Sequence, residues 1–214
     1  MVYSGRRRSL IFVSPISEVL DQKAIRDQED RELVKKSIAD PEMFARIIER
    51  YEKPIIRYIS RISFFSSEEC EEIAQEVFVR VWKNLRGYDE NISFSSWIYH
   101  IARNETINTF HKEKSRGREH RAEWNDEELS NLPGNLDSSR EMDQKISAKN
   151  VGEVLKMIPQ KYRDILVLRY LEELEYLEIA DVLHIPPGTV ATLLHRAKKA
   201  FSDAGKRANI FDIS

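Results

Sequence analysis

The most restrictive feature of the sequence is a short turn, residues 184–189, between two helical patterns. Residues 172–183 carry apolar side chains on one face at helical spacing, which predicts a first helix. The turn contains two adjacent prolines and a glycine, which predicts a break, and Thr189 is expected to cap the next helix. From Val190 to Phe201 apolar residues recur at i, i+4, i+7 and i+11. The segment therefore predicts a helix-turn-helix.

The opposite face of the second helix is predicted to be free, polar and basic. Small and hydrogen-bonding groups come first and cations follow, as in a helix whose N-terminal part reads base edges in the major groove. An ordinary amphipathic helix whose cations only keep it soluble is the alternative, and the Pro-Pro-Gly-Thr turn favours DNA binding. The candidate base contacts are Ala191, Thr192 and His195, with Thr189 at the helix start, and the candidate phosphate contacts are Arg196, Lys198 and Lys199.

The composition is typical of a helix-rich, cytoplasmic protein. Only seven of the 214 residues are glycines and seven are prolines. The net charge is -2, so any affinity for nucleic acid has to come from local charge. Cys70 is the only cysteine, which excludes an internal disulfide and predicts a buried thiol in a reducing compartment. No apolar run is long enough to cross a bilayer, so we expect no membrane insertion.

Three helical patterns occupy the first half of the chain. The first is expected to begin at the cap formed by Asp40 and Pro41, and the second at the Ser-Ser-Glu-Glu cap of residues 66–69. The third begins near Ser93 and becomes polar and basic in its later part. That basic part is either a solvated helix end or, with aromatic residues near it, a site for a single nucleic-acid strand.

An acidic segment divides the chain, and the helical pattern resumes after it. Residues 119–145 are rich in aspartate and glutamate and have little apolar periodicity, which predicts a flexible linker. The expected fold class is all-α, with two small helical domains joined by this linker. The predicted division is an extension of unknown role at 1–38, a first domain at 39–118, the linker at 119–145, a helix-turn-helix domain at 146–204 and a tail at 205–214.

Several motifs in order resemble bacterial sigma factors of the extracytoplasmic-function (ECF) group of the sigma-70 family. Two segments resemble region two, EIAQEVFVRVW at 72–82 and FSSWIYHIARN at 94–104. Two others resemble region four, IPQKYR at 158–163 and the helix-turn-helix. The resemblance implies an initiation subunit that binds core RNA polymerase and promoter DNA. It also implies that an anti-sigma factor commonly keeps this subunit inactive. It also implies no catalytic residue, no cofactor and no metal. Region three of larger sigma factors is missing here.

The resemblance also assigns roles to individual residues. The helix-turn-helix candidates would read the minus-thirty-five element, although Ala191 stands where relatives often carry a basic residue. The loop at 86–93 and the third helix would hold the non-template strand of the minus-ten element. The implied polymerase contacts are Glu72, Gln75, Glu76 and Val79, and the implied minus-ten contacts are Arg86, Tyr88, Arg103, Asn104, Asn108 and Lys112.

Two other classes stay open at this point. A helix-turn-helix regulator that acts without polymerase would bind duplex DNA alone. An enzyme would need a site such as the carboxylate pair Glu72 and Glu76, or His100 and His111 as metal ligands, and no second set of ligands is visible in the sequence. An adaptor that only imitates a sigma factor would have little need of a basic recognition helix.

Overall fold

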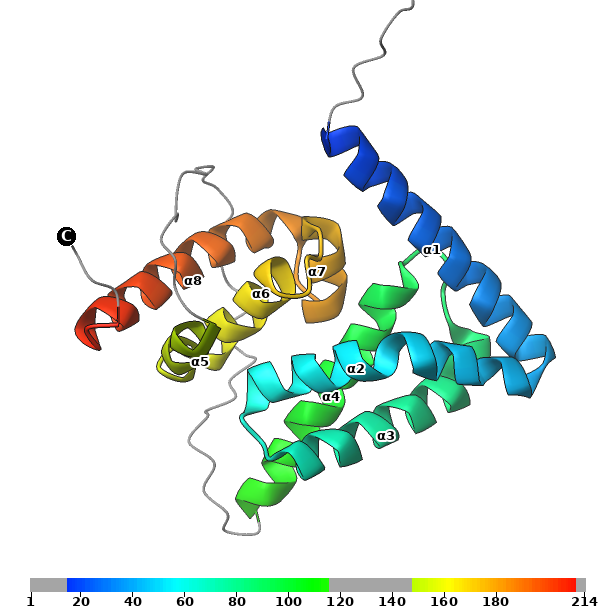
Figure 1. Ribbon diagram of the computed structural model, residues 1–214, viewed down its shortest axis with the longest axis horizontal. Coiled ribbons are helices and arrows are strands. Elements are labelled where there is room, and N and C mark those ends of the chain that lie inside the picture. Colours follow the sequence, from blue (N-terminus) through cyan, green and yellow to red (C-terminus); the bar gives the residue numbers. More distant parts are fainter. Residues whose placement is uncertain (1–14, 116–147, 211–214) are drawn as a thin grey trace, which may run out of the picture.

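The computed structural model describes residues 15–115 and 148–210, and all the regular structure within these ranges is helical (Figure 1). The predicted all-helical fold with two small domains is confirmed. The predicted linker at 119–145 lies outside the described residues.

The first helix, α1 (Pro15–Ala39), occupies most of the segment whose role the sequence left open. It packs against α2 and α4. Val34 is buried, and the hydroxyl of Tyr51 on α2 donates a hydrogen bond to the carboxylate of Asp30, which is also buried. Arg50 pairs with the same carboxylate at 3.2 Å. Helix α1 is therefore held on the first domain by Val34 and Leu33 together with polar contacts, and polar contacts leave no apolar periodicity in the sequence.

The first domain consists of α2 (Phe44–Ser63), α3 (Ser67–Asn84) and α4 (Phe94–Ser115), with short 3-10 turns η1 (Pro41–Met43) and η2 (Leu85–Gly87). Asp40 accepts a hydrogen bond from the backbone N–H of Glu42 at 3.0 Å, as its predicted capping role requires. Ser66 and Glu69 form the reciprocal capping box that was predicted for the second helix. Three of the sequence-based helices thus begin close to where they were expected.

The second domain consists of α5 (Ala148–Lys156), α6 (Gln160–Tyr170), α7 (Tyr176–Leu183) and α8 (Pro187–Arg207). The helix-turn-helix is α7 and α8, but its two predicted helix starts were wrong. Helix α7 begins at Tyr176 and not at residue 172, because Glu173 adopts a left-handed backbone conformation with φ of 57°. The chain therefore crosses from α6 to α7 in a non-helical segment.

Helix α8 begins at Pro187, so Thr189 lies inside the helix and does not cap it. The missing N–H of a proline costs nothing in the first turn, where backbone donors have no partner within the helix. The break between the two helices is narrower than predicted and is made by His184, Ile185 and Pro186. His184 ends α7 with a φ of 52°.

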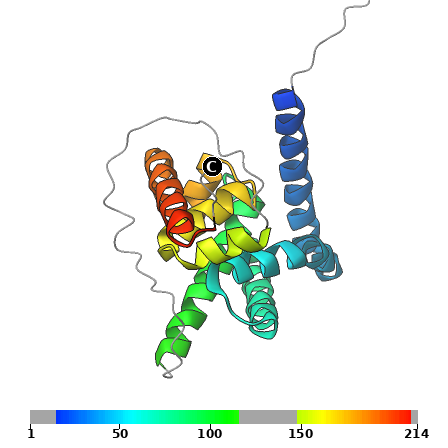
Figure 2. The ribbon, with the colours of Figure 1, turned by 60° about the vertical axis from the view of Figure 1, so that its left-hand side comes forward.

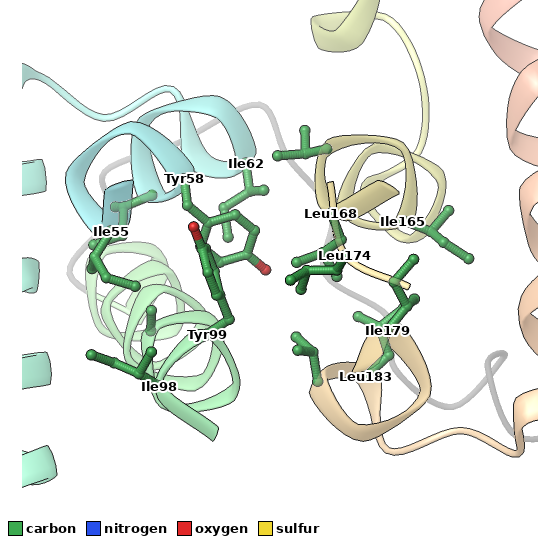
Figure 3. Close-up of a cluster of buried hydrophobic side chains, with 14 of the residues drawn as sticks. Ile55, Tyr58, Ile62, Ile98, Tyr99, Ile165, Leu168, Leu174, Ile179 and Leu183 are labelled. Carbon is green, nitrogen blue, oxygen red and sulfur yellow. The ribbon is translucent and has the colours of Figure 1, made fainter. Parts of the chain in front are cut away.

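The two domains pack against each other through α2 and α4 on one side and α6 and α7 on the other. Tyr58 and Ile62 of the first domain face Leu168 and Leu174 of the second across this contact (Figure 3). All four side chains are buried. Helix α8 lies on the far side of α6 and α7 (Figure 1). The predicted recognition helix is thus left outside the contact between the domains.

Candidate nucleic-acid interface

The cationic face of α8 is open to solvent. His195, Arg196, Lys198 and Lys199 are exposed, and Ala191 is half-buried. Helix α8 packs on α5, α6 and α7 through its apolar side, so these residues lie on its solvent side, where the ammonium of Lys198 also rests over the ring of Tyr170 at 5.4 Å. Figure 2 shows α8 along one side of the molecule. Along the solvent side of α8 the small residue Ala191 comes first and the cations come last, and this order suits a helix lying in a major groove.

Two of the predicted contacts on α8, Thr189 and Thr192, are not on the free face. Their exposed fractions are 6% and 9%. The hydroxyl of Thr192 is buried with no hydrogen-bond partner. Helix α8 buries a wider sector than the single predicted stripe, because three other helices cover it and Leu193 also lies inside. The prediction that Thr192 belongs to the free face was wrong.

The polymerase candidates form an exposed face on α3. Glu72, Gln75, Glu76 and Val79 are all exposed, and Glu76 pairs with Arg80 one turn further on at 3.4 Å. A groove of about 820 Å³ lies between α2 and α3, and Gln75 and Val79 line it. The side chains of Phe44, Ile48, Phe78 and Trp82 give this groove an apolar floor. An exposed polar helix face beside an apolar groove suits a partner helix.

The candidate minus-ten contacts on the loop between α3 and α4 differ in their exposure to solvent. Arg86 is exposed. Tyr88 is 9% exposed, and its ring contacts those of Phe94 and Trp97. Its hydroxyl donates to the backbone carbonyl of Ile92 at 2.6 Å, and burial raises its pKa to about 12. Tyr88 therefore fixes the shape of the loop and does not offer a free ring for stacking on a base.

The candidates on α4 fall into two groups. Asn108 and Lys112, in the later part of the helix, are exposed. Arg103 is 5% exposed and forms an ion pair with Asp164 of α6, with 2.9 Å between Nε and Oδ2. The side-chain amide of Asn104 donates to Nε2 of His100 at 2.8 Å, and the Nδ1–H of His100 donates to the backbone carbonyl of Val182 on α7. The second domain thus covers Arg103, and it holds Asn104 indirectly through His100.

Sequence reasoning missed the carboxylates that the second domain inserts into this contact. Glu172 pairs with Arg61 at 2.8 Å and accepts a hydrogen bond from Tyr99 at 2.7 Å. Burial raises the pKa of the Glu172 carboxyl, while the Tyr99 hydrogen bond and Arg61 act in the opposite direction. Glu172 belongs to an acidic run in the sequence, which normally indicates a solvated surface, so only the three-dimensional contact reveals it.

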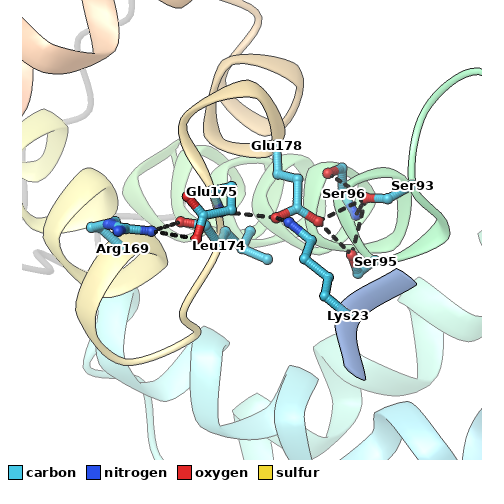
Figure 4. Close-up of polar contacts among 8 residues, drawn as sticks. All are labelled: Lys23, Ser93, Ser95, Ser96, Arg169, Leu174, Glu175 and Glu178. Atoms are coloured by element: carbon cyan, nitrogen blue, oxygen red, sulfur yellow. Dashed lines mark hydrogen bonds and ion pairs between the residues drawn. The ribbon is translucent and has the colours of Figure 1, made fainter. Parts of the chain in front are cut away.

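A second carboxylate, Glu178 of α7, joins three parts of the chain (Figure 4). It accepts hydrogen bonds from Ser93 at 3.1 Å and Ser95 at 3.3 Å, at the start of α4. It forms an ion pair with Lys23 of α1. It also accepts the backbone N–H of Glu175 at 2.8 Å, which closes the first turn of its own helix.

The described residues give no support to a metal centre. Among them no group of three or more histidine, cysteine and acidic side chains is arranged to hold a metal ion. Both ring nitrogens of His100 already have hydrogen-bond partners. In the same part of the chain, every helix is too short or too polar to span a bilayer.

Comparisons with known proteins agree with this geometry. The sigma-70 region 2 profile matches residues 47–116, and the profile of sigma-70 region 4 matches residues 148–201. The ECF RNA polymerase sigma factor SigW of Bacillus subtilis is 35% identical over 182 residues, covering 78% of this chain and 94% of the relative. The RNA polymerase sigma-H factor of Pseudomonas aeruginosa is 26% identical over 182 residues, covering 83% of this chain and 94% of the relative.

Solved structures share the fold. A chain from the complex of CnrH with the cytosolic domain of CnrY superposes with a TM-score of 0.59 at 16% identity, covering 83% of this chain and 97% of that one. A chain from the Bartonella quintana complex of the sigma factor RpoE with the anti-sigma factor NepR gives 0.57 at 14% identity, covering 76% and 96%. The two profile matches and the extent of the likeness to SigW place this chain in the sigma-70 family of RNA polymerase sigma factors, in its extracytoplasmic-function group.

Proposed function

We propose that the protein binds core RNA polymerase through α3 and directs it to promoters, with α8 reading the minus-thirty-five element as a duplex. The observation that carries the proposal is the presence, in one chain, of two separate exposed faces. One is the face of Glu72, Gln75, Glu76 and Val79 beside an apolar groove, and the other is the cationic face of α8. A DNA-binding domain that acts alone does not require the first face.

The loop between α3 and α4, together with α4, supplies the minus-ten contacts in this proposal. Arg86 and Lys112 are exposed and would neutralise phosphates of the non-template strand, and the exposed amide of Asn108 would donate hydrogen bonds to it. Arg103 and Asn104 would join them once the second domain leaves α4. Tyr88 acts indirectly, by holding the loop against Phe94 and Trp97.

Binding polymerase first explains how a chain with net charge -2 finds DNA. Each DNA-binding surface is small and offers few cations, so each one alone binds weakly. When polymerase fixes the two domains at the spacing of a promoter, the second contact becomes intramolecular and its effective concentration rises. An anti-sigma factor is a further expected partner, because such a complex exists for a protein of the same fold.

Run-off transcription with purified core polymerase and a library of promoter fragments tests the proposal. Gln75→Ala should lower the yield by weakening polymerase binding, and Arg196→Ala with Lys198→Ala should lower it through promoter affinity. Excess polymerase should restore the transcript yield of Gln75→Ala and not that of the Arg196→Ala, Lys198→Ala variant. If the protein showed no polymerase binding and shifted duplex DNA alone, it would be a polymerase-independent helix-turn-helix regulator.

A further inference from the structure

The contact between the two domains covers Arg103, one of the residues that the proposed function assigns to the minus-ten strand. Ser95, Tyr99 and Arg103 follow one another at i, i+4 and i+8, so they form one stripe along α4. Each of them contacts the second domain, through Glu178, Glu172 and Asp164 respectively. A DNA strand following the first half of α4 and the second domain cannot occupy this stripe at the same time.

The chemistry of the contact is that of two surfaces that also have to exist in water. It contains three cation–carboxylate pairs: Arg103 with Asp164, Arg61 with Glu172, and Lys23 with Glu178. The three carboxylates and Arg103 are at most 10% exposed, and permanent cores rarely bury charges, because each charge loses its hydration. The hydroxyl of Tyr58 is also buried at this contact with no hydrogen-bond partner, and it would regain water if the domains parted.

Helix α1 bridges the two domains. Its later part is fixed to the first domain by Val34 and Asp30, and its Lys23 reaches Glu178 of the second domain. The side chain of Glu178 is 10% exposed and that of Lys23 is 31% exposed, so the pair is only partly screened by water. Glu178 meets the first turn of α4 through Ser93 and Ser95 at the same point (Figure 4).

We propose that α1 is a latch: Lys23, by pairing with Glu178, holds the second domain closed over α4 and keeps the free protein from engaging the minus-ten strand. This inference rests on the proposed function, because the strand is what the closed form excludes. The exposed face of α3 and the cationic face of α8 stay accessible in the closed form. Polymerase can therefore bind the closed protein first and separate the domains afterwards.

A distance measurement on the free protein tests the latch without reference to transcription. Fluorophores would be attached at Lys83→Cys on α3 and Asp203→Cys on α8, two exposed positions, with the buried Cys70 replaced by alanine. Lys23→Glu places two like charges at the latch, so the ratio of open to closed molecules should rise about fivefold at low salt. Lys35→Glu is the matched control, because Lys35 lies on the same helix and pairs with Glu90 of the first domain.

A thermodynamic cycle separates the latch from a general effect of charge. In a Glu178→Gln background, Lys23→Ala should change the open-to-closed ratio less than about 1.5-fold, because its partner charge is gone. Binding of a short labelled oligo(dT) strand by the free protein should strengthen in proportion to the open fraction. A Lys23→Glu ratio no higher than that of Lys35→Glu, or a wild-type protein that is already open, would overturn the latch.

Run-off transcription separates the latch from the proposed function. With saturating core polymerase, Lys23→Glu should give wild-type yield, because polymerase has already opened the protein. If the wild-type protein gave no promoter-specific transcript, the proposed function would be refuted. The distance measurement would still decide whether α1 holds the domains closed.

Discussion

Arg103 of α4 and Asp164 of α6 form an ion pair in which neither side chain is more than 6% exposed, so the proposed minus-ten surface is joined to the DNA-binding domain by a buried charge pair. Gln160 donates a further hydrogen bond to Asp164 at 2.6 Å. Burial raises the pKa of Asp164, and the charge of Arg103 opposes that rise. This pair couples two functions that the sequence places in separate domains.

Removing the carboxylate should drive the domains apart. Asp164→Ala leaves Arg103 buried without its carboxylate, which costs about 3 kcal/mol if the contact is kept, and undocking lets Arg103 reach water instead. We expect faster hydrogen exchange at the backbone amides of α4 around Arg103, measured by mass spectrometry. Glu153→Ala is the control, because it removes an exposed pair with Lys156 and should cost less than about 0.5 kcal/mol. Unchanged exchange in Asp164→Ala would contradict the coupling.

The buried hydroxyl of Thr192 gives a prediction that separates packing from DNA contact. Thr192→Val keeps the shape of the side chain and removes an unpaired polar atom, so the free energy of unfolding should rise by about 1 kcal/mol. Affinity for a minus-thirty-five duplex should not change. Chemical denaturation and duplex titration measure the two quantities, and a large loss of affinity would show that Thr192 reaches the DNA after all.

The sequence predicted the parts of the fold that rest on local rules. Asp40, Ser66 and Glu69 cap helices as their positions indicated, because capping depends only on neighbouring residues. Helix α1 was not predicted, because it is held by polar groups such as Asp30 together with only a few apolar side chains, Val34 and Leu33 among them. Thr192 was placed on the wrong face, because the number of helices covering α8 is a tertiary property. The roles of Glu172 and Glu178 were invisible for the same reason.

Exposed cations on α8 should contribute to DNA affinity without setting sequence preference. Lys199→Ala should weaken binding to all duplexes about equally and reduce the slope of log K against log salt by about one. His195→Ala should instead alter the preferred base at one position and leave the slope almost unchanged. A titration series over several salt concentrations, with a set of duplexes changed one base pair at a time, distinguishes the two. Equal slopes for wild type and Lys199→Ala would remove Lys199 from the phosphate contacts.

Contact with polymerase should depend on Val79, whose side chain is 41% exposed beside the groove between α2 and α3. Val79→Asp places a charge against an apolar contact, so affinity for core polymerase should fall at least about tenfold with little effect on folding. Glu49→Ala is the control, since Glu49 is exposed on α2 and pairs only locally with Arg46. Competition binding to core polymerase measures both variants. An affinity loss of equal size in Glu49→Ala would show that the effect is not specific to this face.

Acidification should open the contact between the domains through His100. Burial, and to a lesser degree His184 and Arg103, lower the pKa of His100 from 6.5, so the closed form favours the neutral ring. A lowered pKa means that the contribution of His100 to closure is complete above pH 6.5 and is lost as the pH falls towards the lowered value. In the neutral ring of His100, Nδ1–H donates to the backbone carbonyl of Val182 and Nε2 accepts a hydrogen bond from Asn104.

Two carboxyl groups in the same contact act in the opposite direction. Burial raises the pKa values of Asp164 and Glu172, so the closed form gains as these groups take up protons. The difference between wild type and His100→Gln isolates the histidine from these carboxyls. Between pH 7.5 and 5.5 the open fraction, followed by the distance between fluorophores on α3 and α8, should rise more in wild type than in His100→Gln. Parallel pH profiles for the two proteins would show that His100 does not control the contact.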